Sequence, residues 1–283
     1  MPKDQKKKGS IMSVEKVLFK IRQIKDTLKY SSYSLEPQCE DFPFQPLVEL
    51  TASILQANTY LVSASGELLG LFTEFNNINS ERTLGMMNSK QLTPDYMQLI
   101  RQLDRTLENI SIDDERTIFA EEIAEEFPNG KTAIIPMLGS NRIIGYFILA
   151  RPDSTFDDSD MILAEYVATV LAIELDHHIM LEKNKKQQKR DMIAKAINSL
   201  SYSELNAIRI ILEFADSPSF NITASRIAED RDITRSVIVN ALRKLESAGV
   251  LMSQSLGTKG TYIDLFSEEN LSMLREGLNK SPR

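Results

Sequence analysis

The residues whose chemistry stands out are five hydrogen-bond donors grouped between positions 235 and 244. Helical spacing places them on one face of a helix expected from about Arg235 to Ala248, and Gly249 stops that helix. The opposite face is apolar and should be buried. Such donors near the start of a helix can bind base edges and phosphates of DNA. The donors are Arg235, Ser236, Asn240, Arg243 and Lys244, and the apolar stripe is Val237, Ala241, Leu242, Leu245 and Ala248.

The flanking segments complete a winged helix-turn-helix pattern. A short helix with Ile227 and Ala228 on its apolar side is expected after Thr223, and a polar turn then leads to Thr234, the N-cap candidate of the donor-bearing helix. Two short strands, Val250 to Ser255 and Thr261 to Asp264, are joined by a glycine-containing turn. The expected DNA contacts are Arg235, Ser236, Asn240 and Arg243 at or near bases, Thr234 at the helix start, Ser225, Arg226 and Lys244 on phosphates, and Lys259 at the wing tip.

Charge leaves an alternative open for this segment. Residues 226–259 contain six Lys and Arg against four Asp and Glu, a net charge of +2, which is weak electrostatics for DNA binding. Helix-helix-hairpin units also occur as protein-interaction modules. A basic stretch at 183–195, with six Lys and Arg against Asp191 alone, is either a solvated helix face or a source of further phosphate contacts.

Composition limits the class of protein. A chain of 283 residues with 42% hydrophobic and 26% charged residues is typical of a globular protein of about two domains, and its net charge is −7. No run of 18 apolar residues predicts a membrane span, and the single cysteine, Cys39, fits a reducing cytoplasm. The only histidines, His177 and His178, are adjacent and form a poor metal site. We expect neither an enzyme nor a bound metal or cofactor.

The front half of the chain indicates an α+β domain. Helices are followed by an apolar hairpin, a long inserted region at about 74–130, and a second hairpin. This order is that of a GAF- or PAS-like sensor domain, in which inserted loops cover a pocket. The expected elements are helices over Ser13 to Lys29, Pro46 to Ala57 and Pro94 to Leu107, a loop over Ser31 to Phe44, and hairpins over Tyr60 to Phe72 and over Lys131 to Leu138 with Arg142 to Ala150.

A long helix should connect the two halves. It begins near Asp157, where Asp157, Asp158 and Asp160 favour a helix N-terminus, and continues to about Leu200. Long connecting helices often pair in dimers, and a two-fold dimer would present two recognition helices to a palindromic site. The apolar stripe of this helix is Ile162, Leu163, Tyr166, Val167, Val170 and Leu171.

Several segments resemble the CodY family of pleiotropic transcriptional repressors. The match is nearly unbroken over residues 234–250 and continues at 255–257 and 259–262, with further agreement at 200–205 and 156–166. The resemblance covers roughly residues 12–265 and implies a cytoplasmic, dimeric repressor that binds an AT-rich palindromic operator in double-stranded DNA. The implied domains are a disordered basic tail at 1–11, a GAF-like effector-sensing domain at 12–175, a helical linker at 176–200 and a winged helix-turn-helix at 201–283.

The resemblance also implies a site for a branched-chain amino acid, and many CodY proteins respond to GTP, for which no residues can be named here. The arginine that binds the ligand carboxylate in the family falls on Arg82. A guanidinium suits this role because it can bind a carboxylate through two parallel hydrogen bonds. An ordinary surface arginine is the alternative. The apolar cage aligns with Thr83, Met86, Leu92, Thr93, Phe119 and Ala120, and Glu121 stands beside it.

Four positions of this site depart from the family pattern. Thr83 replaces a methionine, Thr93 and Ala120 replace prolines, and Glu121 replaces a small apolar residue. The Glu121 carboxylate could neutralise Arg82 and repel a ligand carboxylate, or it could bind the ligand's ammonium group. We therefore expect a weakened or altered pocket that does not bind isoleucine tightly. The alternative function is a winged-helix regulator whose front half responds to another ligand or to a protein partner.

Overall fold

The computed structural model describes residues 11–31, 44–75, 81–231 and 233–280, so residues 1–10 of the tail expected at 1–11 and most of the expected loop after Ser31 lie outside these ranges, while Ile11 already begins a helix. The chain divides into two compact units, unit 1 over Met1–His178 and unit 2 over Ile179–Arg283. Each unit has a buried apolar core of its own. Every helix in the described ranges is too short or too polar to span a lipid bilayer.

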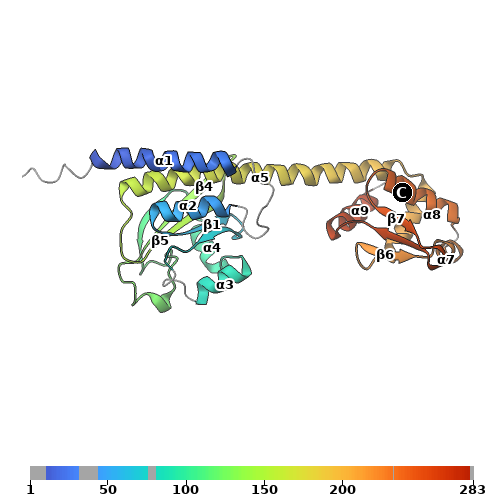
Figure 1. The fold of residues 1–283 in the computed structure, drawn as a ribbon. Helices are drawn as coiled ribbons and strands as arrows, with labels where there is room; N and C mark the ends of the chain where they lie inside the picture. Colours follow the sequence, from blue (N-terminus) through green and yellow to red (C-terminus); the bar gives the residue numbers. More distant parts are fainter. Residues whose placement is uncertain (1–10, 32–43, 76–80, 232, 281–283) are drawn as a thin grey trace, which may run out of the picture. The chain divides into compact units, whose positions relative to one another are not determined.

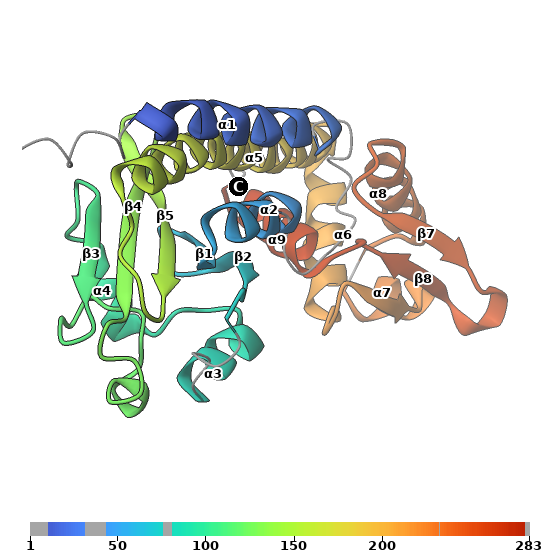
Figure 2. The same cartoon turned by 60° about the vertical axis from the view of Figure 1, so that its left-hand side comes forward.

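Unit 1 is built on a five-stranded antiparallel sheet (Figure 1), and Figure 2 labels its strands, which have the order β2-β1-β5-β4-β3. The hairpin between β1 and β2 turns at Gly66, which adopts φ +97°, a conformation that glycine tolerates without a steric penalty. β5 is buried over most of its length because helices cover both faces of the sheet. The strands are β1 Asn58–Ser63, β2 Leu68–Phe72, β3 Leu107–Ser111, β4 Lys131–Gly139 and β5 Arg142–Arg151.

The helices of unit 1 form layers on the two faces of this sheet. Figure 2 shows α2 and the first half of α5 on one side, with α3 and α4 on the other. Val48 of α2 meets Gly70 of β2 on the first side, while Tyr96 and Met97 of α4 pack with Tyr60 and Tyr146 on the second. The helices are α1 Ile11–Ser31, α2 Gln45–Leu55, α3 Glu81–Ser89, α4 Pro94–Ile100, the short 3-10 helix η2 Glu121–Ile123 and α5 Asp158–Asn198.

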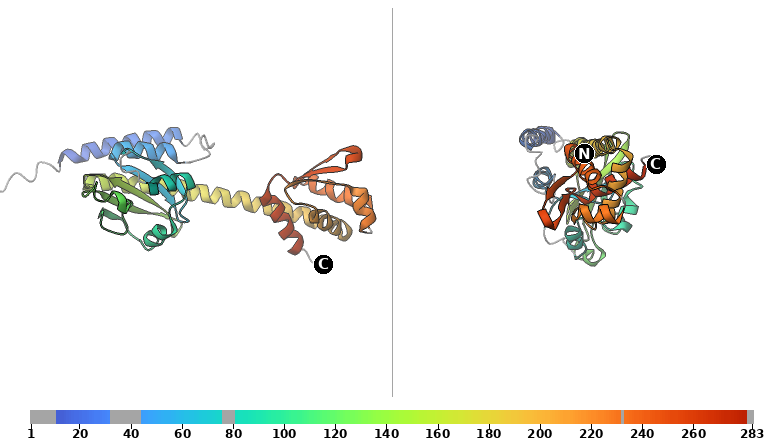
Figure 3. Two further views of the ribbon diagram at one scale, coloured as in Figure 1. Left: turned by 90° about the horizontal axis from the view of Figure 1, so that it is seen from below. Right: turned by 90° about the vertical axis from the view of Figure 1, so that its right-hand side faces the viewer.

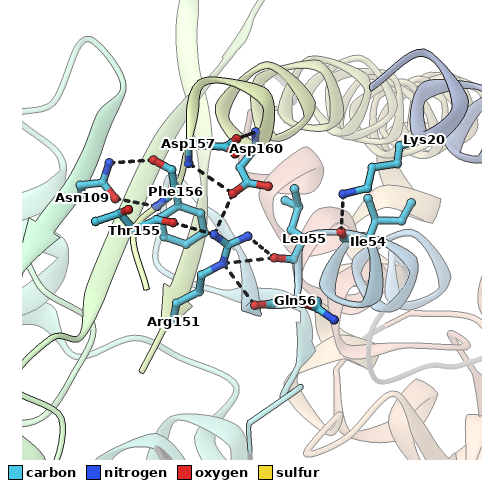
Figure 4. Close-up of polar contacts among 10 residues, drawn as sticks. All are labelled: Lys20, Ile54, Leu55, Gln56, Asn109, Arg151, Thr155, Phe156, Asp157 and Asp160. Atoms are coloured by element: carbon cyan, nitrogen blue, oxygen red, sulfur yellow. Dashed lines mark hydrogen bonds and ion pairs between the residues drawn. The ribbon is translucent and has the colours of Figure 1, made fainter. Parts of the chain in front are cut away.

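The long helix α5 is present, and its start is built as expected from acidic residues. Asp157 and Asp160 exchange backbone-to-carboxylate hydrogen bonds of 2.9 and 3.2 Å, which satisfies two donors at the helix N-terminus. Figure 4 shows these bonds and the Arg151 guanidinium beside them. Arg151 donates to Asp160 across 2.7 Å, to Thr155 O across 2.9 Å, and to the carbonyls of Leu55 and Gln56 at the end of α2.

Two expectations for unit 1 were wrong in detail. The helix expected over Pro94 to Leu107 ends at Ile100, and Leu107 instead opens β3, because there it pairs with Ile134 of β4 and completes the sheet edge. The stripe expected on α5 includes Ile162, which is 55% exposed, whereas Leu163 and Val167 are buried. Apolar residues spaced three or four positions apart cover only part of the helix circumference, and Ile162 lies outside the buried part.

Unit 2 contains the second half of α5, four further α-helices, a short 3-10 helix and a three-stranded sheet with the order β6-β8-β7. Figure 3 shows this unit in orange to red. Its core joins Ile193 and Ile197 of α5 to the apolar faces of the helices and to Ile263 of the sheet. The elements after α5 are α6 Tyr202–Glu213, β6 Ser219–Ile222, α7 Ala224–Asp230, α8 Arg235–Ser247, β7 Met252–Ser255, the short 3-10 helix η3 Gly257–Lys259, β8 Thr261–Asp264 and α9 Glu268–Lys280.

The α+β fold class, with a sensor-like unit, a long helix and a winged helix-turn-helix, is confirmed, while several local expectations are corrected. The wing strand begins at Met252, because Val250 N–H bonds to Leu245 O and thereby closes the end of α8 after Gly249. Ile238 is fully buried in place of Val237, which is only half-buried. The strand β6, which pairs with β8, was not expected from the sequence.

Candidate nucleic-acid interface

The two faces of α8 differ completely in character. Ile238, Ala241, Leu242 and Leu245 are at most 4% exposed and anchor the helix in the core of unit 2. The opposite face exposes donors that, among the described residues, have no side-chain hydrogen bond or ion pair. An anchored helix that presents unpaired donors to solvent is suited to bind a polar partner such as a DNA groove. These exposed donors are Arg235, Asn240 and Arg243.

The start of α8 adds a hydroxyl pair to this face. Thr234 occupies the N-cap position, but its hydroxyl lies 3.0 Å from the Ser236 hydroxyl and makes no capping bond. Thr223 likewise precedes α7 without a side-chain cap. Neither threonine hydroxyl is therefore used to cap a helix. The hydroxyls of Thr234 and Ser236 are exposed beside Arg235.

The first turn of α7 presents two further residues of the expected interface. Ser225 and Arg226 are exposed, and the only ion pair of Arg226 among the described residues is a 3.9 Å contact to Asp230 at 83% and 66% side-chain exposure. A pair this exposed contributes almost nothing to stability. Arg226 is therefore available to a phosphate.

The wing is a short antiparallel hairpin of β7 and β8 with Lys259 exposed at its tip. Gly257 and Gly260 adopt φ +64° and +99°, and Leu256 N–H bonds to Gly260 O across the turn. Glu246 of α8 accepts bonds of 2.9 and 3.1 Å from the backbone and hydroxyl of Ser253 in β7. These two bonds fix the wing to the helix that carries the donors.

Lys244 differs from the other cations of α8. Its Nζ lies 2.7 Å from Glu204 Oε2 in α6 and 3.1 Å from Ser199 O just past the end of α5. Glu204 was not among the residues expected from the sequence. The Ser201-x-x-Glu204 spacing, a capping-box signature, is the signal that could have revealed it.

Charge is segregated between the two units. Unit 1 contains 17 Lys and Arg against 27 Asp and Glu, a net charge of −10, whereas unit 2 contains 16 against 13, a net charge of +3. An acidic chain can bind the DNA polyanion only if it concentrates positive charge on the binding part. The distribution meets this requirement.

The basic stretch of α5 is exposed on all sides over residues 181–190. Two of its cations are engaged with acids, Lys185 with Glu182 and Lys186 with Glu269, each across 2.8 Å. The hydrogen bond from Lys186 lowers the pKa of the Glu269 carboxyl, and the charges of Lys189 and Arg190 add to this effect. Two cations of this stretch are therefore already paired with acids, one of them on α9.

The expected ligand cage of unit 1 is mostly assembled in one place. Met86, Leu92 and Phe119 are 3–4% exposed and belong to one apolar cluster, and Ala120 is buried next to them. Thr93 is half-buried at the N-cap of α4, and Glu121 is exposed at the start of η2. Arg82 and Thr83 lie on α3, but their side chains fall outside the described part, and so does the expected contact between Arg82 and Glu121.

The fold and the exposed face of α8 together define a transcription-factor architecture, a sensor-like α+β domain joined by a long helix to a winged helix-turn-helix. The comparison with family models agrees: residues 16–199 match the CodY GAF-like domain, and residues 220–277 match the CodY helix-turn-helix domain. The chain belongs to the CodY family.

Individual relatives cover nearly the whole chain. It is 39% identical over 260 residues to the global transcriptional regulator CodY of Halalkalibacterium halodurans, covering 92% of this chain and 98% of the relative. It is 42% identical over 233 residues to CodY of Geobacillus kaustophilus, which covers 82% of this chain and 90% of that relative. A solved structure of the cofactor-binding GAF domain of the nutrient sensor CodY from Clostridium difficile is 32% identical, with a TM-score of 0.36, over 56% of this chain and 97% of that one.

Proposed function

We propose that this protein is a transcriptional regulator that acts in the cytoplasm by placing α8 in the major groove of an AT-rich, palindromic operator. The observation that carries this proposal is the exposed face of α8, where Arg235, Asn240 and Arg243 have no side-chain partner among the described residues, opposite a buried apolar stripe. Four side chains lie at or near bases, because they match the donor and acceptor pattern of base edges. They are Arg235, Ser236, Asn240 and Arg243. The phosphate and wing contacts come from Ser225, Arg226, Thr234 and Lys259.

Fluorescence anisotropy on a duplex that the wild-type chain selects from a random pool tests this function. Arg235→Glu should weaken binding more than about 100-fold, because it removes a donor and adds a negative charge facing the groove. The matched control is Lys280→Met, which removes an exposed cation of α9 in the same unit and should leave affinity within about twofold. Equal affinity of the Arg235→Glu and wild-type chains would reject this face of α8 as the interface.

Unit 1 is proposed to sense a small effector in the cage of Met86, Leu92, Thr93, Phe119 and Ala120, with Arg82, Thr83 and Glu121 beside it. The support is family membership and the clustering of the described cage side chains. Met86, Leu92 and Phe119 are already buried in the apolar cluster of unit 1, so an aliphatic ligand has to displace protein contacts before it gains its own. Weak binding of isoleucine is the result we propose.

Calorimetry with isoleucine, leucine, valine and GTP, followed by operator binding with each one added, tests the effector. Millimolar isoleucine affinity is the expected result, and micromolar affinity would overturn it. Binding to DNA that ignores all four compounds would favour the alternative in which unit 1 responds to another ligand or to a protein partner.

We also propose a homodimer, because a palindrome presents two equivalent half-sites. The surface that supports it is an apolar strip on the first half of α5, where Ile162 and Ile173 are 55% and 64% exposed, with half-buried Tyr166 between them. Positions 11 residues apart return to nearly the same face of a helix. Paired copies of α5 would remove these side chains from water.

Analytical ultracentrifugation of the full chain tests the dimer. Ile173→Glu should shift the chain from dimer to monomer, because a carboxylate in an apolar contact is not compensated. Leu84→Glu is the matched control, since Leu84 is 50% exposed on α3, which lies on the other side of the sheet from α5. A monomeric wild-type chain would refute the proposal.

A further inference from the structure

Lys244 stands on the donor-bearing helix but is already engaged within the protein. Its ammonium group donates to Glu204 Oε2 across 2.7 Å and to Ser199 O across 3.1 Å. The Lys244 side chain is 43% exposed, whereas that of Glu204 is only 9% exposed. The ion pair therefore has one end in the protein interior, where charges interact more strongly than at the surface.

Glu204 is held in place independently of Lys244. It is the third residue of α6 and forms a capping box with Ser201, accepting the Ser201 N–H across 2.7 Å while the Ser201 hydroxyl accepts the Glu204 N–H. The hydrogen bond from Lys244 is the largest contribution that lowers the pKa of the Glu204 carboxyl, followed by the bond from the Ser201 backbone. Glu204 is thus a fixed acceptor at the junction between α5 and α6.

The contacts of Lys244 join three elements at one point. Ser199 follows the last residue of α5, Glu204 lies in the first turn of α6, and Lys244 lies in the last turn of α8. Arg243, its neighbour in sequence, has no partner among the described residues and is exposed. Two adjacent cations of one helix therefore have different environments.

We propose that Lys244 is a positioning residue, which sets the placement of α8 on α6 and the end of α5 through Glu204 and Ser199 and does not bind a DNA phosphate. This inference rests on the proposed function. A recognition helix held before DNA arrives loses less conformational freedom on binding, so the contact raises affinity without touching DNA. Arg243 makes the direct contact.

Salt dependence separates the two roles. Each cation that neutralises a phosphate adds about 0.9 to the slope of log affinity against log salt concentration, and a residue that acts through position adds nothing. Lys244→Met should weaken operator binding about tenfold, the equivalent of one charged hydrogen bond, with an unchanged slope. Arg226→Met, which removes an exposed cation proposed to bind a phosphate, should weaken binding and lower the slope by about 1.

Glu204→Gln is the decisive second variant. It retains an acceptor for the capping box but removes the negative charge that holds Lys244. A positioning role predicts weaker operator binding, about 3- to 10-fold, and little further loss when Lys244→Met is added, because both changes break one contact. A phosphate-binding role predicts equal or tighter binding, because Lys244 is released toward DNA.

Circular dichroism and amide hydrogen exchange on the full chain complete the experiment. All variants should retain the wild-type helical signal, and exchange should quicken at the start of α6 and the end of α8 in Lys244→Met but not in Arg243→Met. A lowered salt slope in Lys244→Met, or unchanged exchange there, overturns the inference. If the wild-type chain selects no duplex, the proposed function fails, while the exchange result still decides whether Lys244 positions α8.

Discussion

Arg151 and Asp160 form a 2.7 Å ion pair in unit 1, with side chains only 10% and 16% exposed. The same guanidinium lies 4.3 Å from the centroid of the Phe156 ring and caps carbonyls at the end of α2. Lys244 and Glu204 form a similar arrangement in unit 2. There too, a cation binds a carboxylate that receives a backbone hydrogen bond at a helix start, and it also binds a carbonyl just past the end of another helix. Both the start of α5 and the segment that follows it are fixed by such a pair.

Replacing Arg151 should destabilise unit 1 severely. Arg151→Met removes the cation that pairs with the Asp160 carboxylate and donates to the Leu55 and Gln56 carbonyls, and breaking a buried pair in this way costs about 3 kcal/mol or more. Urea unfolding followed by circular dichroism measures the loss. Arg142→Met on the same strand, where Arg142 is exposed, should change stability by no more than about 0.5 kcal/mol.

The wing should require glycine at position 260 much more than at position 257. Gly260 has φ +99°, and a Cβ there would lie 2.2 Å from Ile222 O of β6, whereas a Cβ at Gly257 meets no atom within 4 Å. Gly260→Ala should cost about 2–3 kcal/mol and Gly257→Ala about 1 kcal/mol, since both positions have positive φ. Thermal unfolding of the two variants checks the order, and equal losses would contradict it.

Arg275 and Arg209 should each stabilise the packing of α6 against α9. Arg275 donates to Leu212 O and Ala215 O at the end of α6, across 3.1 and 2.7 Å, while Arg209 of α6 donates to Leu278 O of α9 across 2.9 Å. Arg275→Met should lower the unfolding free energy by about 1–2 kcal/mol, because two carbonyls lose a charged donor. Lys280→Met, at an exposed position of the same helix, serves as the control in urea titrations.

Asp114 should make stability depend weakly on pH in the acid range. Hydrogen bonds from the Arg116 guanidinium, at 2.6 and 2.8 Å, lower the pKa of the Asp114 carboxyl from 3.8 to about 2. A lowered folded-state pKa stabilises the protein above about pH 4, and this contribution disappears as the pH falls toward 2. Because Asp114 and Arg116 are 29% and 41% exposed, the effect should not exceed about 1 kcal/mol.

A comparison of wild type with Asp114→Asn measures this contribution. The difference in unfolding free energy should be present at neutral pH and should be lost as the pH falls through the folded-state pKa of about 2. A difference that persists at the lowest pH would rule out ionisation of Asp114 as its cause.

The sequence alone determined the winged helix-turn-helix, the order of elements in the front half and the long helix, because each depends on local periodicity, turn residues and helix ends. The donors of α8 could be named because helical spacing separates them from the apolar stripe. Only the tertiary structure decided which partners those donors have. Lys244 and Arg243 are adjacent and both cationic, yet only Lys244 meets Glu204, which is 40 residues away in the chain.

The same physical reason explains the other differences. Leu107 lies in a strand, and β6 pairs with the wing strand β8, because their backbone groups bond to strands that are distant in the sequence. Pairing between distant segments leaves no periodic signal in the sequence. The sequence analysis did not single out Arg151, because its role arises only where the ends of α2 and β5 and the start of α5 meet.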